Sequence, residues 1–178
     1  MKIKTLVLLF FILLLVSCSK ENRTSRGEKI EKAIYPDVVL KNATCQISQQ
    51  NGSPIMLEGE KIEFYSKDEY CLLENFSFSS YSESGEIEVE GSGNSGKIWI
   101  NSGKIEIEGN VSFSKTEDNM LVLASSLVYD KEKDEITTKG RVEVRNNTSH
   151  IIGFDFVGDL KEEAYSFSLI EKGELDFD

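Results

Sequence analysis

Apolar and polar residues alternate along most of this chain, and the alternation is most regular between Gly96 and Val144. The apolar residues that recur there at every second position are Ile105, Ile107, Val111, Phe113, Leu121, Leu123, Leu127, Tyr129, Ile136, Val142 and Val144. A period of two is typical of strands that bury one face and leave the other in water. Polar residues such as Glu106 and Glu143 fall where the wet face is expected. The stretch therefore predicts a run of β-strands.

One phrase in this stretch occurs twice. Gly109-Asn-Val-Ser-Phe113 returns 31 residues later as Gly140-Arg-Val-Glu-Val144. A repeat of this length indicates one supersecondary unit copied along the chain. Because each copy lies in an alternating strand bounded by turn residues, we interpret the unit as a β-hairpin.

The same pattern predicts strands on both sides of the repeat. They are expected at Val38–Ile47, Ile55–Tyr65, Tyr70–Ser80, Glu86–Glu90, His150–Val157 and Ala164–Ile170. The residues expected to share a strand face are Val39 with Cys45 and Ile47, Leu72 with Phe76 and Phe78, and Ile152 with Phe154 and Phe156. Gly59 interrupts its strand and predicts a bulge. The segment Gly91–Gly96 is interpreted as a flexible link, and Glu171–Asp178 as an acidic tail.

About ten short strands separated by turn residues, with almost no helical periodicity, predict an all-β fold. The pattern alone leaves a sandwich, a jelly roll and a solenoid open. Hairpins that follow one another in sequence leave a strand with unpaired backbone groups at each end of the sheet. Such an open end can accept a strand from a partner.

The first residues have the character of a targeting segment. Lys2 and Lys4 precede an unbroken apolar run of 11 residues, Leu6–Val16, which is too short to span a bilayer. Leu15-Val16-Ser17-Cys18 then resembles a bacterial lipobox, which predicts lipid attachment at Cys18. An ordinary secretory signal and an uncleaved anchor, with Cys18 incidental, are the alternatives.

The predicted organisation has four parts. Residues 1–17 form a lipoprotein signal peptide, and residues 18–33 form the lipidated N-terminus and a flexible tether. Residues 34–170 form the β domain, and residues 171–178 form the acidic tail.

Charge narrows the classes of partner. The chain has 20 basic and 31 acidic residues and a net charge of −11. Cleavage before Cys18 removes Lys2 and Lys4 and makes the mature chain more acidic still. Such a chain repels nucleic-acid phosphates, and it contacts an anionic lipid surface only through its acyl anchor.

Few residues offer catalytic or ligand-binding chemistry. His150 is the single histidine, and a mechanism of the Ser-His-Asp or Cys-His kind would depend on it alone. We interpret it as a strand-edge residue. The glycines of Gly91–Gly96 lack the Lys-Ser/Thr ending and the following helix of a phosphate-binding loop. No spacing fits a metal site, so we expect no enzyme, no metal and no cofactor.

Two cysteines and three Asn-x-Ser/Thr triplets could also be modified. Cys45 and Cys71 can form a disulfide outside the cytoplasm or stay as two unpaired thiols, the second being our expectation. Asn42, Asn75 and Asn110 begin Asn-x-Ser/Thr triplets, which we interpret as chance.

The alternating apolar residues are expected to face one interior. The candidates are Phe64, Phe76, Phe78, Ile98, Ile100, Ile107, Val111, Phe113, Leu127, Tyr129, Val142, Val144, Phe154 and Phe156. They predict either an ordinary packed core or an apolar groove between two sheets that holds acyl chains. Composition does not separate these two interpretations.

Four phrases resemble the LptC/LptA (OstA-like) family of lipopolysaccharide transport. They are Tyr35–Val39, Leu57–Phe64, Gly103–Val111 and Leu123–Val142. The family repeat pairs an A-x-x-L-x-Y strand with a G-x-V strand. Ala124, Leu127, Tyr129, Gly140 and Val142 match this frame, as do Gly109 and Val111. The resemblance covers about residues 35–160, and the membrane-attached N-terminus favours LptC over LptA.

The resemblance implies a twisted antiparallel β-jelly roll, open at both ends, whose V-shaped interior holds the acyl chains of lipopolysaccharide or a related glycolipid. It implies a periplasmic carrier that receives lipid from an inner-membrane ABC transporter's jelly-roll domains at the N-terminal edge, Val38–Ile47. The C-terminal edge, Ala164–Ile170, would pass the lipid to an LptA-like bridge. The family anchor is usually a transmembrane helix, whereas Cys18 here predicts a lipid anchor, most simply in the inner membrane.

Two alternatives remain at this point. One is a structural scaffold lipoprotein that assembles with itself through its open sheet edges. The other is a surface-exposed binding lipoprotein.

Overall fold

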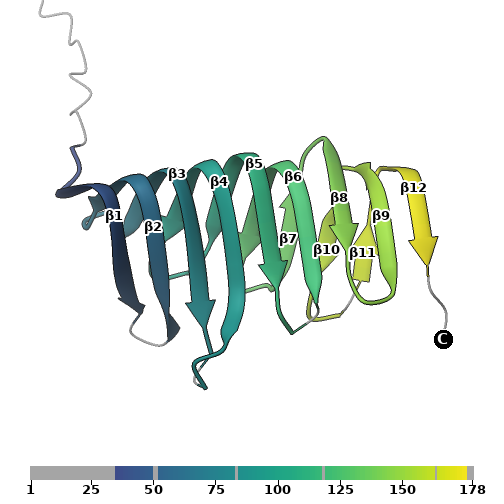
Figure 1. The fold of residues 1–178 in the computed structure, drawn as a ribbon, viewed down its shortest axis with the longest axis horizontal. Helices are drawn as coiled ribbons and strands as arrows, with labels where there is room; N and C mark the ends of the chain where they lie inside the picture. The colour runs from purple at the N-terminus through teal and green to yellow at the C-terminus, as the bar shows by residue number, and fades with distance from the viewer. Residues whose placement is uncertain (1–34, 50–51, 83, 118, 163, 176–178) are drawn as a thin grey trace, which may run out of the picture. The chain divides into compact units, whose positions relative to one another are not determined.

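A computed structural model describes residues 35–49, 52–82, 84–117, 119–162 and 164–175. The predicted signal segment, Cys18 and the tether lie outside these residues. Within them the chain forms twelve strands (Figure 1). The strands are β1 (Val38–Gln49), β2 (Gly52–Tyr65), β3 (Tyr70–Tyr81), β4 (Ile87–Trp99), β5 (Ile105–Lys115), β6 (Met120–Asp130), β7 (Glu135–Thr138), β8 (Arg141–Arg145), β9 (Ser149–Phe154), β10 (Val157–Asp159), β11 (Ala164–Ser166) and β12 (Leu169–Leu175).

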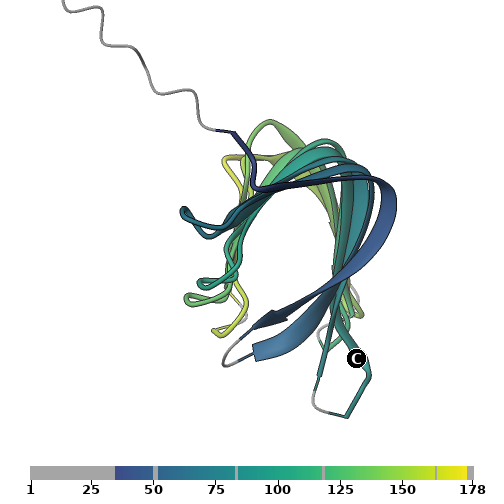
Figure 2. The same ribbon diagram turned by 90° about the vertical axis from the view of Figure 1, so that its left-hand side faces the viewer.

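All strands pair antiparallel in one sheet, and the sheet bends into two walls. β1 to β6 are long and neighbour one another in sequence order, and each passes through both walls. The first wall continues from β6 through β7, β10 and β11. The second wall continues from β6 through β8, β9 and β12. Seen end on, the two walls face each other (Figure 2).

The walls meet along a line that we call the corner, which crosses every long strand near its middle. Left-handed backbone marks it: φ is +46° at Asn42 in β1, +44° at Asn75 in β3 and +50° at Asn110 in β5. Gly140 separates β7 from β8, and Asp155 separates β9 from β10, with φ of +76° and +50°. Asparagine, aspartate and glycine adopt this conformation most readily, so the residue types fit the bend.

At the corner each long strand has residues that are left out of the pairing, and this resets which face the following residues occupy. In β3, Cys71 and Leu73 are buried before Asn75, whereas Phe76 and Phe78 are buried after it. Simple alternation through the whole strand cannot produce that pattern. It requires one extra residue at the corner, and because β2 and β4 bend at the same level, the register of β3 with both neighbours is the same on either side.

Several predicted strand faces are therefore wrong on one side of the corner. The residues that face outward instead of inward are Val39, Leu72, Leu121, Leu123, Ile152 and Phe154. Leu72 lies between two buried residues of its strand. Each of the others is the register partner of a charged residue on the neighbouring strand. Asp155 explains the last case, because its left-handed backbone reverses the phase between Phe154 and the fully buried Phe156.

Two segments predicted to be irregular are strands. Gly91–Gly96 lies inside β4 rather than forming a link. The predicted tail contributes to β12, which ends at Leu175 and pairs with β9. The sheet therefore extends beyond the predicted domain boundary at residue 170.

The corner predicts a specific effect of side chain on stability. Asn75→Ala should lower the free energy of unfolding by about 1–2 kcal/mol, because in left-handed backbone the Cβ atom of alanine lies too close to the following carbonyl oxygen. Asn75→Gly removes the same hydrogen bond from Asn75 Nδ2 to Glu60 Oε2 (2.6 Å) but avoids the steric cost, so its loss should be smaller. Urea unfolding of both variants measures the difference, and equal losses would contradict this account of the bend.

Candidate functional site

The space between the walls is the candidate site, and it contains most of the residues predicted to line it. Eleven of them belong to one buried apolar cluster: Phe76, Phe78, Ile98, Ile107, Val111, Phe113, Leu127, Tyr129, Val142, Val144 and Phe156. Phe64 and Ile100 are partly buried and pack against it. Phe154 does not join it and lies opposite Arg141 on the outward face.

Sequence reasoning missed a second group of interior residues. They include Ile55, Leu57, Ile62, Leu73, Met120, Val122 and Leu160, all of them buried. The alternation of apolar residues within Ile55–Tyr65 was a signal for Ile55 and Leu57. Met120 and Val122 were missed because the buried face of β6 changes from even-numbered to odd-numbered residues at the corner.

A row of glycines in β4 makes room for large side chains of the neighbouring strands β3 and β5. A Cβ atom at Gly96 would lie 2.4 Å from Cζ of Phe76, and one at Gly91 would lie 2.5 Å from Cε1 of Phe78. A Cβ atom at Gly93 would lie 2.3 Å from Cγ2 of Ile107. Neighbouring strands thus fill the space that β4 leaves, which is why a segment that resembles a linker is part of the strand.

Side chains fill the interior, and a small pocket lies at the side opposite the corner. We call this side the mouth: here the turns at residues 100–103 and 131–134 of the first wall approach the ends of β4 and β5 in the second. The pocket has a volume of ≈ 20 Å³, room for about one water molecule. It is lined by Ile55, Phe78, Ser80, Glu88 and Val89 of the second wall and by Gly103, Ile105, Tyr129 and Lys131 of the first.

The two ends of the sheet are open. Among the described residues, β1 pairs only with β2, and at the other end β11 pairs only with β10 and β12 only with β9. Large apolar side chains are exposed at both ends: Val38 and Val39 on β1, and Leu169, Ile170 and Leu175 on β12. Unpaired backbone beside exposed apolar residues is what a partner strand requires.

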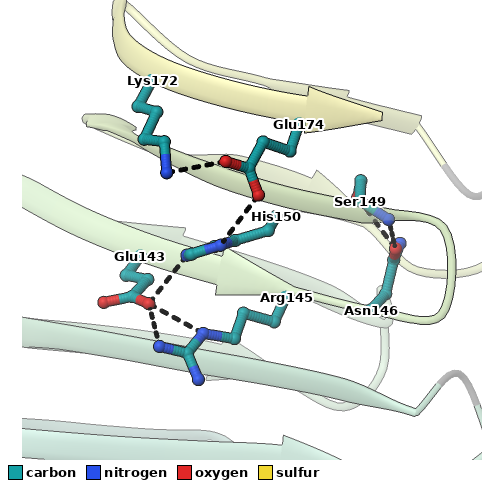
Figure 3. Close-up of polar contacts among 7 residues, drawn as sticks. All are labelled: Glu143, Arg145, Asn146, Ser149, His150, Lys172 and Glu174. Atoms are coloured by element: carbon teal, nitrogen blue, oxygen red, sulfur yellow. Dashed lines mark hydrogen bonds and ion pairs between the residues drawn. The ribbon is translucent and has the colours of Figure 1, made fainter. Parts of the chain in front are cut away.

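A polar network on the outward face ties β12 to the sheet (Figure 3). His150 on β9 lies between two carboxylates: its Nε2 is 2.9 Å from Oε1 of Glu143 on β8, and its Nδ1 is 4.0 Å from Oε2 of Glu174 on β12. Arg145 also donates to Glu143, and this contact together with His150 lowers the pKa of the Glu143 carboxyl. Lys172 lowers the pKa of Glu174 in the same way. These contacts give His150 a structural position at the end of the sheet.

The two described cysteines are unpaired. Cys71 is buried in the first wall, and burial raises the pKa of its thiol to about 12. Cys45 is partly buried in the second wall, and desolvation raises its pKa as well. Both therefore stay protonated at neutral pH and are poor nucleophiles. Among the described residues, no group of three or more histidine, cysteine or acidic side chains could hold a metal ion.

Residues 5–171 match the model of the family described as "Lipopolysaccharide-assembly, LptC-related". The chain belongs to this family. A search of curated proteins finds no match. LptC-related proteins are periplasmic bridge components that bind lipopolysaccharide and contact other Lpt proteins, and this LptC-related chain is therefore involved in lipopolysaccharide transport.

A solved structure confirms the fold of this LptC-related chain. It is described as the crystal structure of LptH, the LptA-homologous periplasmic component of the lipopolysaccharide transport device from Pseudomonas aeruginosa. The TM-score is 0.57 at 11% identity, and the match covers 71% of this chain and 96% of that chain. The prediction of an open, antiparallel jelly roll is confirmed. The described part of the chain contains no helix long and apolar enough to cross a membrane.

The close contact at β4 gives a testable prediction for this LptC-related interior. Gly96→Ala should lower the free energy of unfolding by about 1–3 kcal/mol, the usual cost of overpacking, because the added methyl collides with the Phe76 ring. Ser95→Ala is the matched control, since Ser95 is exposed on the same strand and should change stability little. Thermal or urea unfolding measures both variants, and equal effects would show that the interior has room to spare.

Proposed function

We propose that this protein holds the acyl chains of lipopolysaccharide between its two walls and passes them along the periplasmic bridge without performing a chemical reaction. The observation that carries the proposal is the apolar cluster itself. It runs without interruption from β1 to the segment around β10 and draws residues from both walls. An acyl chain lying along it would replace contacts between the walls with contacts to methylenes.

The energetics suit a carrier rather than a permanent binder. Each methylene transferred from water to such an interior contributes about 0.8 kcal/mol. An acyl chain that moves along the interior leaves one apolar position and enters an equivalent one, so its movement changes the free energy little once it is between the walls. The pocket at the mouth is too small for an alkyl chain, so entry requires the walls to move apart.

The open ends supply the contacts of the bridge. We infer that the unpaired edge of β1 meets the jelly-roll domains of an inner-membrane ABC transporter. The edge formed by β11 and β12 then meets the next, LptA-like bridge protein. Exposed Val38 and Val39 at one end, and Leu169, Ile170 and Leu175 at the other, support this assignment. Lipid attachment at Cys18 would hold the chain at a membrane, the inner membrane in this arrangement.

Site-specific photocrosslinking in cells tests where the lipid lies. A photoreactive residue at Phe113, which is fully buried between the walls, should capture lipopolysaccharide when the transporter is active. The matched control is the adjacent position Ser112, whose side chain lies on the opposite face of β5. Ile107 and its outward neighbour Glu106 form a second pair. Capture at the outward positions, or equal capture within each pair, would contradict binding between the walls.

A further inference from the structure

A buried ion pair joins the two walls at the mouth. Lys115 is the last residue of β5 in the second wall, and only 7% of its surface is exposed. Its Nζ lies 3.0 Å from Oδ2 of Asp134, which precedes β7 in the first wall. Lysine is almost never buried without an ionic partner. The pair therefore closes the mouth on the side opposite the corner.

Two further hydrogen bonds hold Asp134, one at its carboxylate and one at its backbone carbonyl. The Tyr129 hydroxyl donates a hydrogen bond of 3.0 Å to Oδ1 of Asp134, and the Leu160 amide donates one of 2.8 Å to the Asp134 carbonyl. The Tyr129 ring packs on Phe113 at 5.2 Å between centroids. The same side chains thus connect the ion pair directly to the apolar interior.

The ion pair borders the pocket at the mouth. Tyr129 lines this pocket, and Val89, which also lines it, is the register partner of Lys115. Ile55, Phe78 and Ile105 give the pocket apolar walls, and Lys131 and Glu88 are its charged lining residues. The carboxylate of Glu88 offsets the charge of Lys131, so the Lys115 ammonium beside the pocket is the group that favours an anionic headgroup on an alkyl chain.

We propose that Lys115 is the anion-binding residue of a port through which an acyl chain enters the interior. In the closed protein the Asp134 carboxylate forms an ion pair with the Lys115 ammonium, and this pair holds the walls together. When an amphiphile enters, its phosphate replaces Asp134 on Lys115 while its chain takes the space between Phe113 and Tyr129. This inference rests on the proposed function, since it names the entry site for the same ligand.

The exchange is physically reasonable because the ammonium is never left alone. Removing one partner of a buried ion pair is costly, since the remaining charge is uncompensated. A phosphate offers the same charge-assisted hydrogen bond as a carboxylate. The mouth can therefore open for a phosphorylated amphiphile at little electrostatic cost, whereas a neutral one gains no such compensation.

Calorimetric titration of the mature full-length protein tests the port. The probes are dodecyl phosphate and dodecyl maltoside, both below their micellar concentrations, which share a chain and differ in headgroup charge. Wild type should bind the phosphate more tightly. Lys115→Gln should weaken phosphate binding about tenfold, the size of one charge-assisted hydrogen bond. It should not weaken maltoside binding, because it removes the ion pair that holds the walls together and no contact to the neutral headgroup.

Three further variants sharpen the test. Asp134→Asn removes the competing carboxylate and should tighten phosphate binding, while Lys115→Arg keeps the charge and should retain the preference. Lys172→Gln removes a lysine that pairs with Glu174 on the outward face and should behave as wild type. If Lys115→Gln fails to fold, Asp134→Asn and Lys115→Arg still decide the outcome.

The outcomes separate the two proposals. If both probes bind but Lys115→Gln keeps the preference for phosphate, or Asp134→Asn does not bind it more tightly, the port is wrong and the apolar carrier stands. If neither probe binds to any variant, the proposed acyl-chain carrier fails, and the port fails with it.

Discussion

The bend across the middle of the strands determines nearly everything else in this protein. A flat antiparallel sheet with one apolar face would need another layer to cover it. Here the sheet covers itself, because left-handed residues in alternate strands, Asn42 in β1, Asn75 in β3 and Asn110 in β5, mark a bend that all six long strands share. The interior, the mouth and the two open ends all follow from that fold. The walls are held to one another by side-chain packing and by contacts at the mouth, so their separation can change without breaking the backbone ladder.

The sequence predicted the strands well and their faces only in part. Alternation located the strands because burial of one face is a local constraint. It failed across the corner, since an inserted residue shifts the phase: Leu72 and Phe76 were assigned to one face, yet Leu73 and Phe76 are the buried pair. A signal for the corner was present. Asn42, Asn75 and Asn110, whose Asn-x-Ser/Thr triplets we interpreted as chance, recur near the middle of their strands. Asparagine is a residue type that tolerates left-handed backbone.

The glycines of β4 and the residues of β12 show a second limit of prediction. Glycine and serine usually indicate a flexible segment, but Gly91, Gly93 and Gly96 are required by the rings and branched side chains that occupy the space beside them. That requirement comes from neighbouring strands and is invisible in the local sequence. β12 is exposed along its whole length, so it has no alternation to detect. Its pairing with β9 and the polar contacts of His150, Lys172 and Glu174 keep it in the sheet.

Charge explains why entry at the mouth is more plausible than entry elsewhere along the walls. A net charge of −11 repels an anionic amphiphile over most of the outward surface. At the mouth, Lys131 lines the apolar pocket together with Glu88, and Lys115 lies next to it in a pair with Asp134. An anion that replaces Asp134 on Lys115 would therefore be attracted and buried at one place. The ends of the sheet are different, because exposed backbone and apolar side chains there suit protein strands. In the proposed arrangement, lipid enters at the mouth and partner proteins bind at the ends of the sheet, so a lipid entering between the walls need not displace a partner.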